Sequence, residues 1–258
     1  MPVLVGTSGW QYKHWDRRFY AASLARGDQL ARYAELFAVV EVNATFYRLP
    51  EAGVFRAWAE QTPADFRFVV KASRFLTHFK RLKDPEEPVA RLMGRARELG
   101  SKLSAVLLQL PPQMHGDAGR LDAALALLGK EARVAVEPRH ESWYTPEVRE
   151  VLERHGAALC LADRGSAWIT PRWRTAAWGY LRFHGGAVQP PGCYSREALA
   201  ERASEAAVLW GRQAEVFAFF NNDMHLCALR DAGWFAAEAA RAGLDPTRVP
   251  AAEEIPVG

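Results

Sequence analysis

The stretch Arg133-Val134-Ala135-Val136-Glu137-Pro138-Arg139-His140 indicates the fold class of this 258-residue chain. Its first half is an almost continuous apolar run, without the polar alternation of a strand that has one solvated face. Strands of this kind belong to parallel sheets that are covered on both faces. The charged residues that follow it are therefore expected at the carboxyl edge of such a sheet.

The same order of apolar run, polar residue and helical stretch repeats along the chain. Eight repeats in one α/β domain over residues 1–258 predict a single-domain (βα)8 TIM-like barrel, because no linker or composition break divides the chain. A doubly wound open sheet is the alternative, and residues 166–178 fit the barrel least well because they lack a helical pattern. The other predicted strands are 3–5, 39–43, 66–71, 105–110, 157–163, 179–184 and 215–222.

The composition is that of an ordinary globular protein, with 49% hydrophobic residues and a net charge of +3, which alone does not indicate nucleic acid. Cys160, Cys193 and Cys227 are far apart and form no CxxC motif, so we expect free thiols. The chain shows no signal peptide and no apolar run near the ~20 residues that span a membrane. A cytoplasmic location without membrane association is the default expectation.

Polar residues stand at the end of nearly every predicted strand. Ligands of parallel α/β folds bind at that edge, and isolated buried charges are costly. Several such residues on one face therefore predict a polar ligand pocket. The candidates are Thr7, Ser8, Glu41, Asn43, Lys71, Gln109, Glu137, Arg139, Asp163, Arg182, His184, Asn221 and Asn222.

Each candidate also has a structural interpretation. Glu41 and Lys71 could form an ion pair with no further role, and His184 could be a hydrogen-bonded core residue. Asn221 and Asn222 could form a turn, because asparagine tolerates left-handed geometry. The spacing of two residues favours a shared face for Arg182 and His184, as it does for Glu137 and Arg139, although Pro138 weakens the second case.

Two loop groups could complete the pocket. Trp10, Tyr12 and Trp15 follow the first predicted strand and are expected to form an apolar lid over the barrel mouth. Basic residues follow the second and third strands, where they either form a solvated surface or attract an anion. These basic residues are Arg48, Arg74, His78, Lys80, Arg81 and Lys83.

Metal binding is the less favoured interpretation of the same strand ends. Glu41, Glu137, Asp163 and His184 are competent ligands for a divalent metal. Cationic side chains would crowd the same mouth and offset the carboxylates, and no HExxH motif is present. We therefore expect no metal and no cofactor, and an anionic, phosphate-containing ligand instead.

Beyond these patterns, the chain carries a set of short motifs spread over almost its whole length. They are residues 6–10 with Tyr12 and Trp15, 19–20, 41–50, Lys71 with Arg74, Thr77 and His78, 109–112, Glu137 with 139–140 and 142–143, Asp163, 182–185, Tyr194 and 220–223. In these motifs the chain resembles the DUF72 family, also called YecE-like proteins, with departures at Ala21, Pro138 and Asp231. The resemblance implies a TIM barrel similar in outline to those of xylose isomerase and endonuclease IV, and it implies no established reaction.

Three functions are compatible with this sequence. The first is an enzyme that acts on an anionic substrate, with phosphoester hydrolysis as the first reaction to test. Glu137 or Glu41 would be the general base and His184 the general acid. Lys71, Arg139 and Arg182 would hold the anion. The second is a non-catalytic protein that binds nucleic acid or a nucleotide. A metal-dependent isomerase or lyase is the weaker third. The sequence indicates no oligomeric state.

Overall fold

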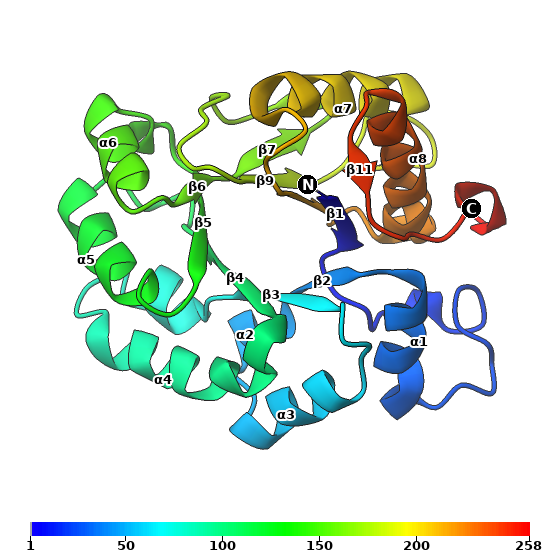
Figure 1. Cartoon of the computed structure of the whole chain (residues 1–258), viewed down its shortest axis with the longest axis horizontal. Helices are drawn as coiled ribbons and strands as arrows, with labels where there is room; N and C mark the ends of the chain where they lie inside the picture. The colour runs from blue at the N-terminus through cyan, green and yellow to red at the C-terminus, as the bar shows by residue number, and fades with distance from the viewer. Residues whose placement is uncertain (1) are drawn as a thin grey trace.

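The computed structural model describes residues 2–258 and places the parallel strands in a ring. In the view of Figure 1 the helices surround this ring on its outer side. The hydrogen-bonded order is β6-β5-β4-β3-β2-β1-β10-β9-β7-β8. The strands are β1 (Pro2–Thr7), β2 (Val39–Val42), β3 (Arg67–Lys71), β4 (Leu103–Gln109), β5 (Arg133–Glu137), β6 (Ala158–Leu159), β7 (Leu161–Arg164), β8 (Ala167–Trp168), β9 (Gly179–Phe183), β10 (Val216–Phe220) and β11 (Asp245–Pro246).

One interrupted strand joins the two ends of this order. β6 pairs in parallel with β5, and β7, which begins two residues after β6 ends, pairs in parallel with β9. The break falls at Cys160, whose backbone N–H still donates to the carbonyl oxygen of Val136. The predicted TIM-like barrel is thereby confirmed, with its sixth strand shared between two neighbours.

Helices follow the barrel strands because amphipathic segments cover the outer face of the sheet. Three of them begin at capping residues that the sequence provides: the side chains of Asp117, Thr145 and Ser195 accept hydrogen bonds from the N–H groups of Arg120, Val148 and Ala198. The helices are α1 (Gln29–Leu36), α2 (Ala44–Tyr47), α3 (Ala52–Glu60), α4 (Glu86–Ala96), α5 (Ala118–Leu128), α6 (Pro146–Arg154), α7 (Arg196–Trp210) and α8 (Cys227–Arg241).

Short 3₁₀ or π turns complete the connections. Most of them lie in loops next to the strand ends. Their bounds are Lys13–Trp15, Arg26–Asp28, Phe75–Phe79, Arg97–Lys102, Glu141–Trp143, Met224–Leu226 and Ala252–Glu254.

The connection from β7 to β9 has no α-helix within the described chain, as the pattern of residues 166–178 predicts. β8 instead folds back antiparallel onto β7. Two threonine hydroxyls in this connection take the place of backbone partners: Thr170 accepts from the N–H of Ala162 and Thr175 from that of Leu159. The irregular segment, which contains no helix, therefore provides hydrogen-bond acceptors for these backbone N–H groups of the barrel strand.

Alternate residues of each strand face the barrel interior. Leu4, Val39, Val69, Leu107 and Phe217 belong to one buried apolar cluster inside the ring. Their neighbours along each strand belong to the larger cluster between the sheet and the helices. Because side chains alternate with a period of two, this register also decides which polar strand-end residues point inward.

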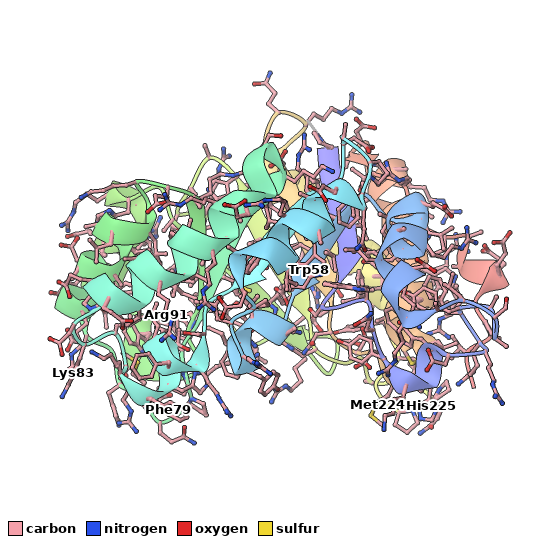
Figure 2. All side chains as sticks on the ribbon, turned by 90° about the horizontal axis from the view of Figure 1, so that it is seen from below. Trp58, Phe79, Lys83, Arg91, Met224 and His225 are labelled. Atoms are coloured by element: carbon pink, nitrogen blue, oxygen red, sulfur yellow. A yellow bond between two sulfur atoms is a disulfide. The ribbon has the colours of Figure 1, made fainter. Side chains whose placement is uncertain are left out.

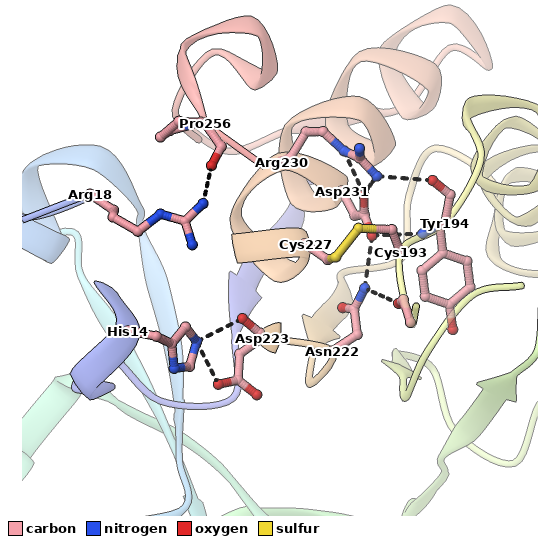
Figure 3. The surroundings of a disulfide bond; sticks show 11 residues. His14, Arg18, Cys193, Tyr194, Asn222, Asp223, Cys227, Arg230, Asp231 and Pro256 are labelled. Carbon is pink, nitrogen blue, oxygen red and sulfur yellow. Dashed lines mark hydrogen bonds and ion pairs between the residues drawn. A yellow bond between two sulfur atoms is a disulfide. The ribbon is translucent and has the colours of Figure 1, made fainter. Parts of the chain in front are cut away.

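The cysteine prediction is wrong in one respect. Cys193 and Cys227 form a disulfide across 34 residues, while Cys160 is free and buried. The bond joins the loop after β9 to the first residue of α8, as Figure 3 shows. The barrel brings these two loops together, a contact that the spacing of the cysteines does not reveal. No helix within residues 2–258 combines the length and the apolar character required to cross a membrane.

Candidate functional site

Charged side chains form a buried layer above the apolar interior, at the carboxyl ends of the barrel strands. The guanidinium of Arg182 lies between two carboxylates, with Nη1 2.5 Å from Glu137 Oε2 and Nη2 2.7 Å from Glu41 Oε1. The Tyr180 hydroxyl donates to the other Glu41 oxygen at 2.5 Å. Arg182 is 1% exposed and both glutamates are fully buried. Glu41 is thus paired with Arg182, and the suggested ion pair with Lys71 does not form.

The second carboxylate oxygen of Glu137 accepts hydrogen bonds from two further side chains. Arg139 Nη2 lies 2.8 Å and His184 Nε2 2.7 Å from Glu137 Oε1. Burial alone would raise the pKa of Glu137, but the charge of Arg182, the hydrogen bond from His184 and the charge of Arg139 outweigh it and hold that pKa below its usual range. A carboxylate that stays ionised and fully paired is a poor proton acceptor. The geometry favours a positioning role for Glu137 over its predicted role as general base.

His184 links this layer to the open side of the site. Burial lowers its pKa, although the hydrogen bond to Glu137 opposes the shift. The neutral ring is consistent with Nε2–H donating to Glu137 and with Nδ1 accepting from the Asn221 side-chain nitrogen at 3.2 Å. We call Glu41, Glu137, Arg139, Arg182 and His184 the inner network.

Lys71 stands beside the inner network without a direct partner. Its ammonium nitrogen lies 4.4 Å from the centre of the Phe46 ring, and no hydrogen bond or ion pair of that nitrogen is found within residues 2–258. The residue is 8% exposed. Burial, followed by the charge of Arg182, lowers the pKa of Lys71 to about 8, although Glu41 and Glu137 oppose this shift. Within the described residues, Lys71 is therefore a cation at the cavity wall that has no directly paired carboxylate.

A first cavity of about 690 Å³ opens above the inner network. Its charged lining is mainly cationic: Lys71, Arg139 and Arg164 face a single carboxylate, Glu141, among the described lining residues. Three histidines and several neutral groups complete it. These further residues are His78, His140, His184, Phe46, Tyr47, Gln109, Pro112, Pro138, Tyr144, Ile169 and Asn221.

A second cavity of about 500 Å³ adjoins the first on the side of the β1 loop. The two cavities share Tyr47, Lys71 and Asn221. Its remaining lining residues come from the loops after β1, β2 and β10. They are Ser8, Gly9, Trp10, Gln11, Tyr12, Asn43, Ala44 and Asp223.

The cavities lie among loops that follow the carboxyl ends of the strands. Figure 2 shows Phe79 and Lys83, from the connection after β3, on the same side of the molecule as Met224 and His225, which follow β10. The barrel thus gathers these loops at one end, which is the end where α/β barrels bind their ligands.

Strand register separates the predicted residues into two groups. The inward positions reach the cavities or the layer beneath them, and the outward ones do not. Glu41, Glu137 and Arg182 lie in the layer beneath. The residues that line the cavities are Ser8, Trp10, Tyr12, Asn43, Lys71, His78, Gln109, Arg139, His184 and Asn221.

The remaining predicted residues line neither cavity. The Thr7 hydroxyl bonds to the Gly9 carbonyl oxygen and to Tyr33, and Trp15 is fully buried in the core. Arg74 lies against the rings of Tyr47 and Phe79 in a separate surface hollow. Trp15 is therefore part of the core and not of a lid.

Asp163 and Asn222 point outward, toward α7 and α8. Asp163 accepts from the Tyr194 hydroxyl at 2.8 Å and from Arg202 Nε at 2.9 Å. Asn222 donates to Asp231 at 2.7 Å and to the Gly192 carbonyl oxygen at 2.9 Å, close to the disulfide (Figure 3). These contacts give both residues structural roles.

Several lining residues were not among the predicted ligand contacts. His140 follows Arg139 directly, and Arg164 is the last residue of β7, so a strand-end position was the available signal for both. Glu141 and Tyr144 lie in a loop where no pattern marked them. Asp223 ends the 220–223 motif of the family resemblance, but it was not predicted as a ligand contact.

The acidic residues of the layer are not arranged for a metal. Within residues 2–258 no group of three or more His, Cys, Asp or Glu side chains converges on a common point. Glu41 and Glu137 are instead occupied by arginines and by Tyr180 or His184. This arrangement suits a site organised around cations.

Comparison with known sequences identifies the family. The family described as "Protein of unknown function DUF72" matches residues 4–254. The chain belongs to the DUF72 family. The UPF0759 protein YunF of Bacillus subtilis (strain 168) is 24% identical over 255 residues, covering 86% of this chain and 89% of YunF. The UPF0759 protein YecE of Escherichia coli (strain K12) is 29% identical over 154 residues, covering 59% of this chain and 54% of YecE.

Solved structures show the same fold. The crystal structure of a DUF72 family protein from Thermotoga maritima MSB8 has 30% sequence identity and a TM-score of 0.76, covering 91% of this chain and 98% of that one. SacUVDE has 9% identity and a TM-score of 0.54, covering 89% of this chain and 96% of its own. At that identity SacUVDE shares the fold alone.

Proposed function

We propose that this DUF72 protein is an enzyme that acts on a small anionic substrate, with phosphate esters as the first class to test. The observation that carries the proposal is the uncompensated charge of Lys71. The carboxylates of Glu41 and Glu137 match the guanidinium groups of Arg139 and Arg182, which leaves the Lys71 ammonium unmatched at the cavity wall. An anion bound there would supply the missing charge.

The cavity lining offers the groups that phosphoester hydrolysis requires. Lys71 and Arg139 would bind the phosphate and stabilise the negative charge that develops during the reaction. Glu137 accepts a hydrogen bond from His184 Nε2–H, which leaves Nδ1 as the unprotonated ring nitrogen. In the free protein Nδ1 accepts from the Asn221 amide. It would become the ring atom that takes a proton from the attacking water when that amide turns to the substrate. Gln109 and Asn221 would orient the substrate.

The test is hydrolysis of a panel of phosphomonoesters by the purified full chain. Lys71→Met shortens the side chain by one atom and removes its charge, so we expect turnover to fall at least 100-fold while the melting temperature does not decrease. Lys83→Met, in an exposed loop, is the matched control and should retain wild-type turnover. Equal turnover of Lys71→Met and the wild type would contradict the proposal.

A second candidate function, nucleic-acid binding, is favoured by a surface next to the first cavity. Tyr47 and Phe79 are 67% and 68% exposed, and the Arg74 guanidinium lies 5.9 and 5.6 Å from the centres of their rings. Lys80 lies 5.9 Å from the Phe75 ring. Exposed aromatic rings interleaved with cations are the elements that stack bases and contact the backbone of single strands.

This candidate predicts a strong dependence on salt. Binding of a fluorescent single-stranded oligonucleotide should weaken steeply between 50 and 200 mM salt, roughly in proportion to the number of phosphate contacts. Charge reversal at Lys80, Arg81 and Lys83 should weaken it further. Affinity that is insensitive to both changes would argue against this function.

A further inference from the structure

The two adjoining cavities differ in charge and in the hydrogen-bonding atoms that they present. Arg139 and Arg164 line only the first cavity. The second has the carboxylate of Asp223, and its lysine, Lys71, is the one that it shares with the first. An anionic group is therefore favoured in the first cavity and disfavoured next to Asp223.

Three residues that line the second cavity each carry a buried side-chain atom without a hydrogen-bond partner within residues 2–258. Ser8 Oγ and Trp10 Nε1 make no hydrogen bond, and Ser8 and Trp10 are 1% and 6% exposed. Asn43 donates its Nδ2 to the Ser8 carbonyl oxygen at 2.9 Å, which fixes the amide and leaves Oδ1 unpaired. Buried polar atoms are normally satisfied, so three of them on residues that line one cavity favour a ligand whose groups reach them on binding.

The loop after β1 is shaped to present these atoms. Gly9 has a φ of +120°, and a Cβ there would lie 2.9 Å from the Tyr12 hydroxyl oxygen. That hydroxyl donates to the Ser8 carbonyl oxygen, which also accepts from Asn43. The close contact requires glycine, and the two hydrogen bonds hold the backbone of Ser8 in place.

We infer that the second cavity binds an uncharged, hydroxyl-bearing part of the same substrate, so that the substrate class is a phosphorylated sugar or polyol. Trp10 offers a hydrogen-bond donor, Asn43 an acceptor and Ser8 both. Hydroxyl groups can form hydrogen bonds with all three, because each hydroxyl both donates and accepts. Trp10 is buried against Trp58, with ring centres 5.2 Å apart, so it offers no open face on which a base could stack. Lys71 lies where the two parts of the substrate would meet.

This inference rests on the proposed function, and calorimetric titration separates the two. The probes are inorganic phosphate, ribose, ribose 5-phosphate and glucose 6-phosphate. We expect at least one sugar phosphate to bind the wild-type protein at least ten-fold more tightly than inorganic phosphate or ribose. Lys71→Met should weaken the binding of inorganic phosphate and of the sugar phosphates alike.

Two variants remove the unpaired atoms without removing a hydrogen bond within the protein. Ser8→Ala and Trp10→Phe should each weaken sugar-phosphate binding roughly three- to ten-fold, the value of one hydrogen bond, with little change for inorganic phosphate. Ser204→Ala, on the exposed side of α7, makes the same chemical change as Ser8→Ala outside both cavities and should have no effect.

The outcomes are distinct. Sugar phosphates that bind no more tightly than inorganic phosphate would overturn the inference and leave the anion site standing. Ser8→Ala and Trp10→Phe proteins that weaken both kinds of probe equally would also overturn it. Absence of inorganic phosphate binding, with no effect of Lys71→Met on any probe, would overturn the proposed function itself.

Discussion

Two buried charge networks lie on opposite faces of the barrel strands, and they differ in completeness. The outer network joins β7 to α7: Arg202 donates to Asp163, to Glu205 and to the Ser166 carbonyl oxygen. Its guanidinium also lies 4.9 Å from the centre of the Trp168 ring. No polar side-chain atom of Asp163, Arg202 or Glu205 is both buried and unpaired within residues 2–258.

The inner network is incomplete by comparison. Within residues 2–258 the Nε atoms of Arg139 and Arg182 are buried without partners, and Lys71 adds a cation with no directly paired carboxylate. It also lies beneath a cavity of about 690 Å³. Buried charge alone therefore does not distinguish the two networks, because both have it. The distinguishing features are unmatched cationic groups and a cavity that can admit an anion.

The largest expected effect comes from the inner network. Glu137→Gln removes the charge that Arg139 and Arg182 share, so it should lower the free energy of unfolding by about 3–5 kcal/mol at pH 7. Urea denaturation followed by circular dichroism measures this change. Glu141→Gln, at the exposed rim of the first cavity, should cost less than about 0.5 kcal/mol. A Glu137→Gln protein as stable as the wild type would refute the buried pairing.

Loss of the disulfide should have the second largest effect on stability, and it lies outside the inner network. Cys193→Ala combined with Cys227→Ala should lower the free energy of unfolding by roughly 3 kcal/mol, because the bond closes a loop of 34 residues. Sulfate serves as a probe of the anion site, and we expect its affinity for the double variant to stay within three-fold of that for the wild type. A larger loss of affinity would mean that the loop after β9 shapes the anion site.

Asp163→Asn should have the smallest effect on stability. The Arg202 guanidinium keeps its contact with Glu205, so we expect the free energy of unfolding to fall by about 1–3 kcal/mol, mainly from the weakened hydrogen bonds at Asp163. Sulfate affinity, measured by calorimetry, should not change. A stability loss as large as that of Glu137→Gln would remove the contrast between the two networks.

The barrel and its strand ends could be predicted because apolar runs and helical periodicity are local features of the sequence. The spacing of two residues also predicted that Arg182 shares a face with His184, and Glu137 with Arg139. In the structure both pairs lie on the inward side. Asp163 was predicted to lie in the same pocket, but the period of two residues turns its side chain outward. That error was unavoidable from the sequence alone, because a strand buried on both faces has no polar alternation to show which side is inward.

The pairings within the site could not be predicted for a different reason. Glu41 and Arg182 are 141 residues apart, and they meet because β2 and β9 each place a residue in the same layer of the closed ring. The disulfide has the same origin, since two loops at one end of the barrel bring Cys193 and Cys227 together. Contacts of this kind depend on strand order and register, which no short motif encodes.

The pH dependence of sulfate binding tests the central claim about Lys71 most directly. Sulfate keeps its charge between pH 6 and 10, so any change of affinity reports on the protein. The pKa of Lys71 is lowered to about 8, so the ammonium is charged below that pH and loses its proton above it. Titration calorimetry of the wild type and of Lys71→Met, over this pH range, measures the contribution of that charge.

The account predicts that wild-type affinity is constant below about pH 7 and falls from about pH 8 upward. At pH 6.5 it should exceed that of Lys71→Met by roughly ten- to 100-fold, the value of one charge-assisted hydrogen bond. With rising pH it should approach the affinity of the variant, which itself shows no step near pH 8. A wild-type affinity that equals that of Lys71→Met at pH 6.5, or that shows no fall above pH 8, would contradict the account.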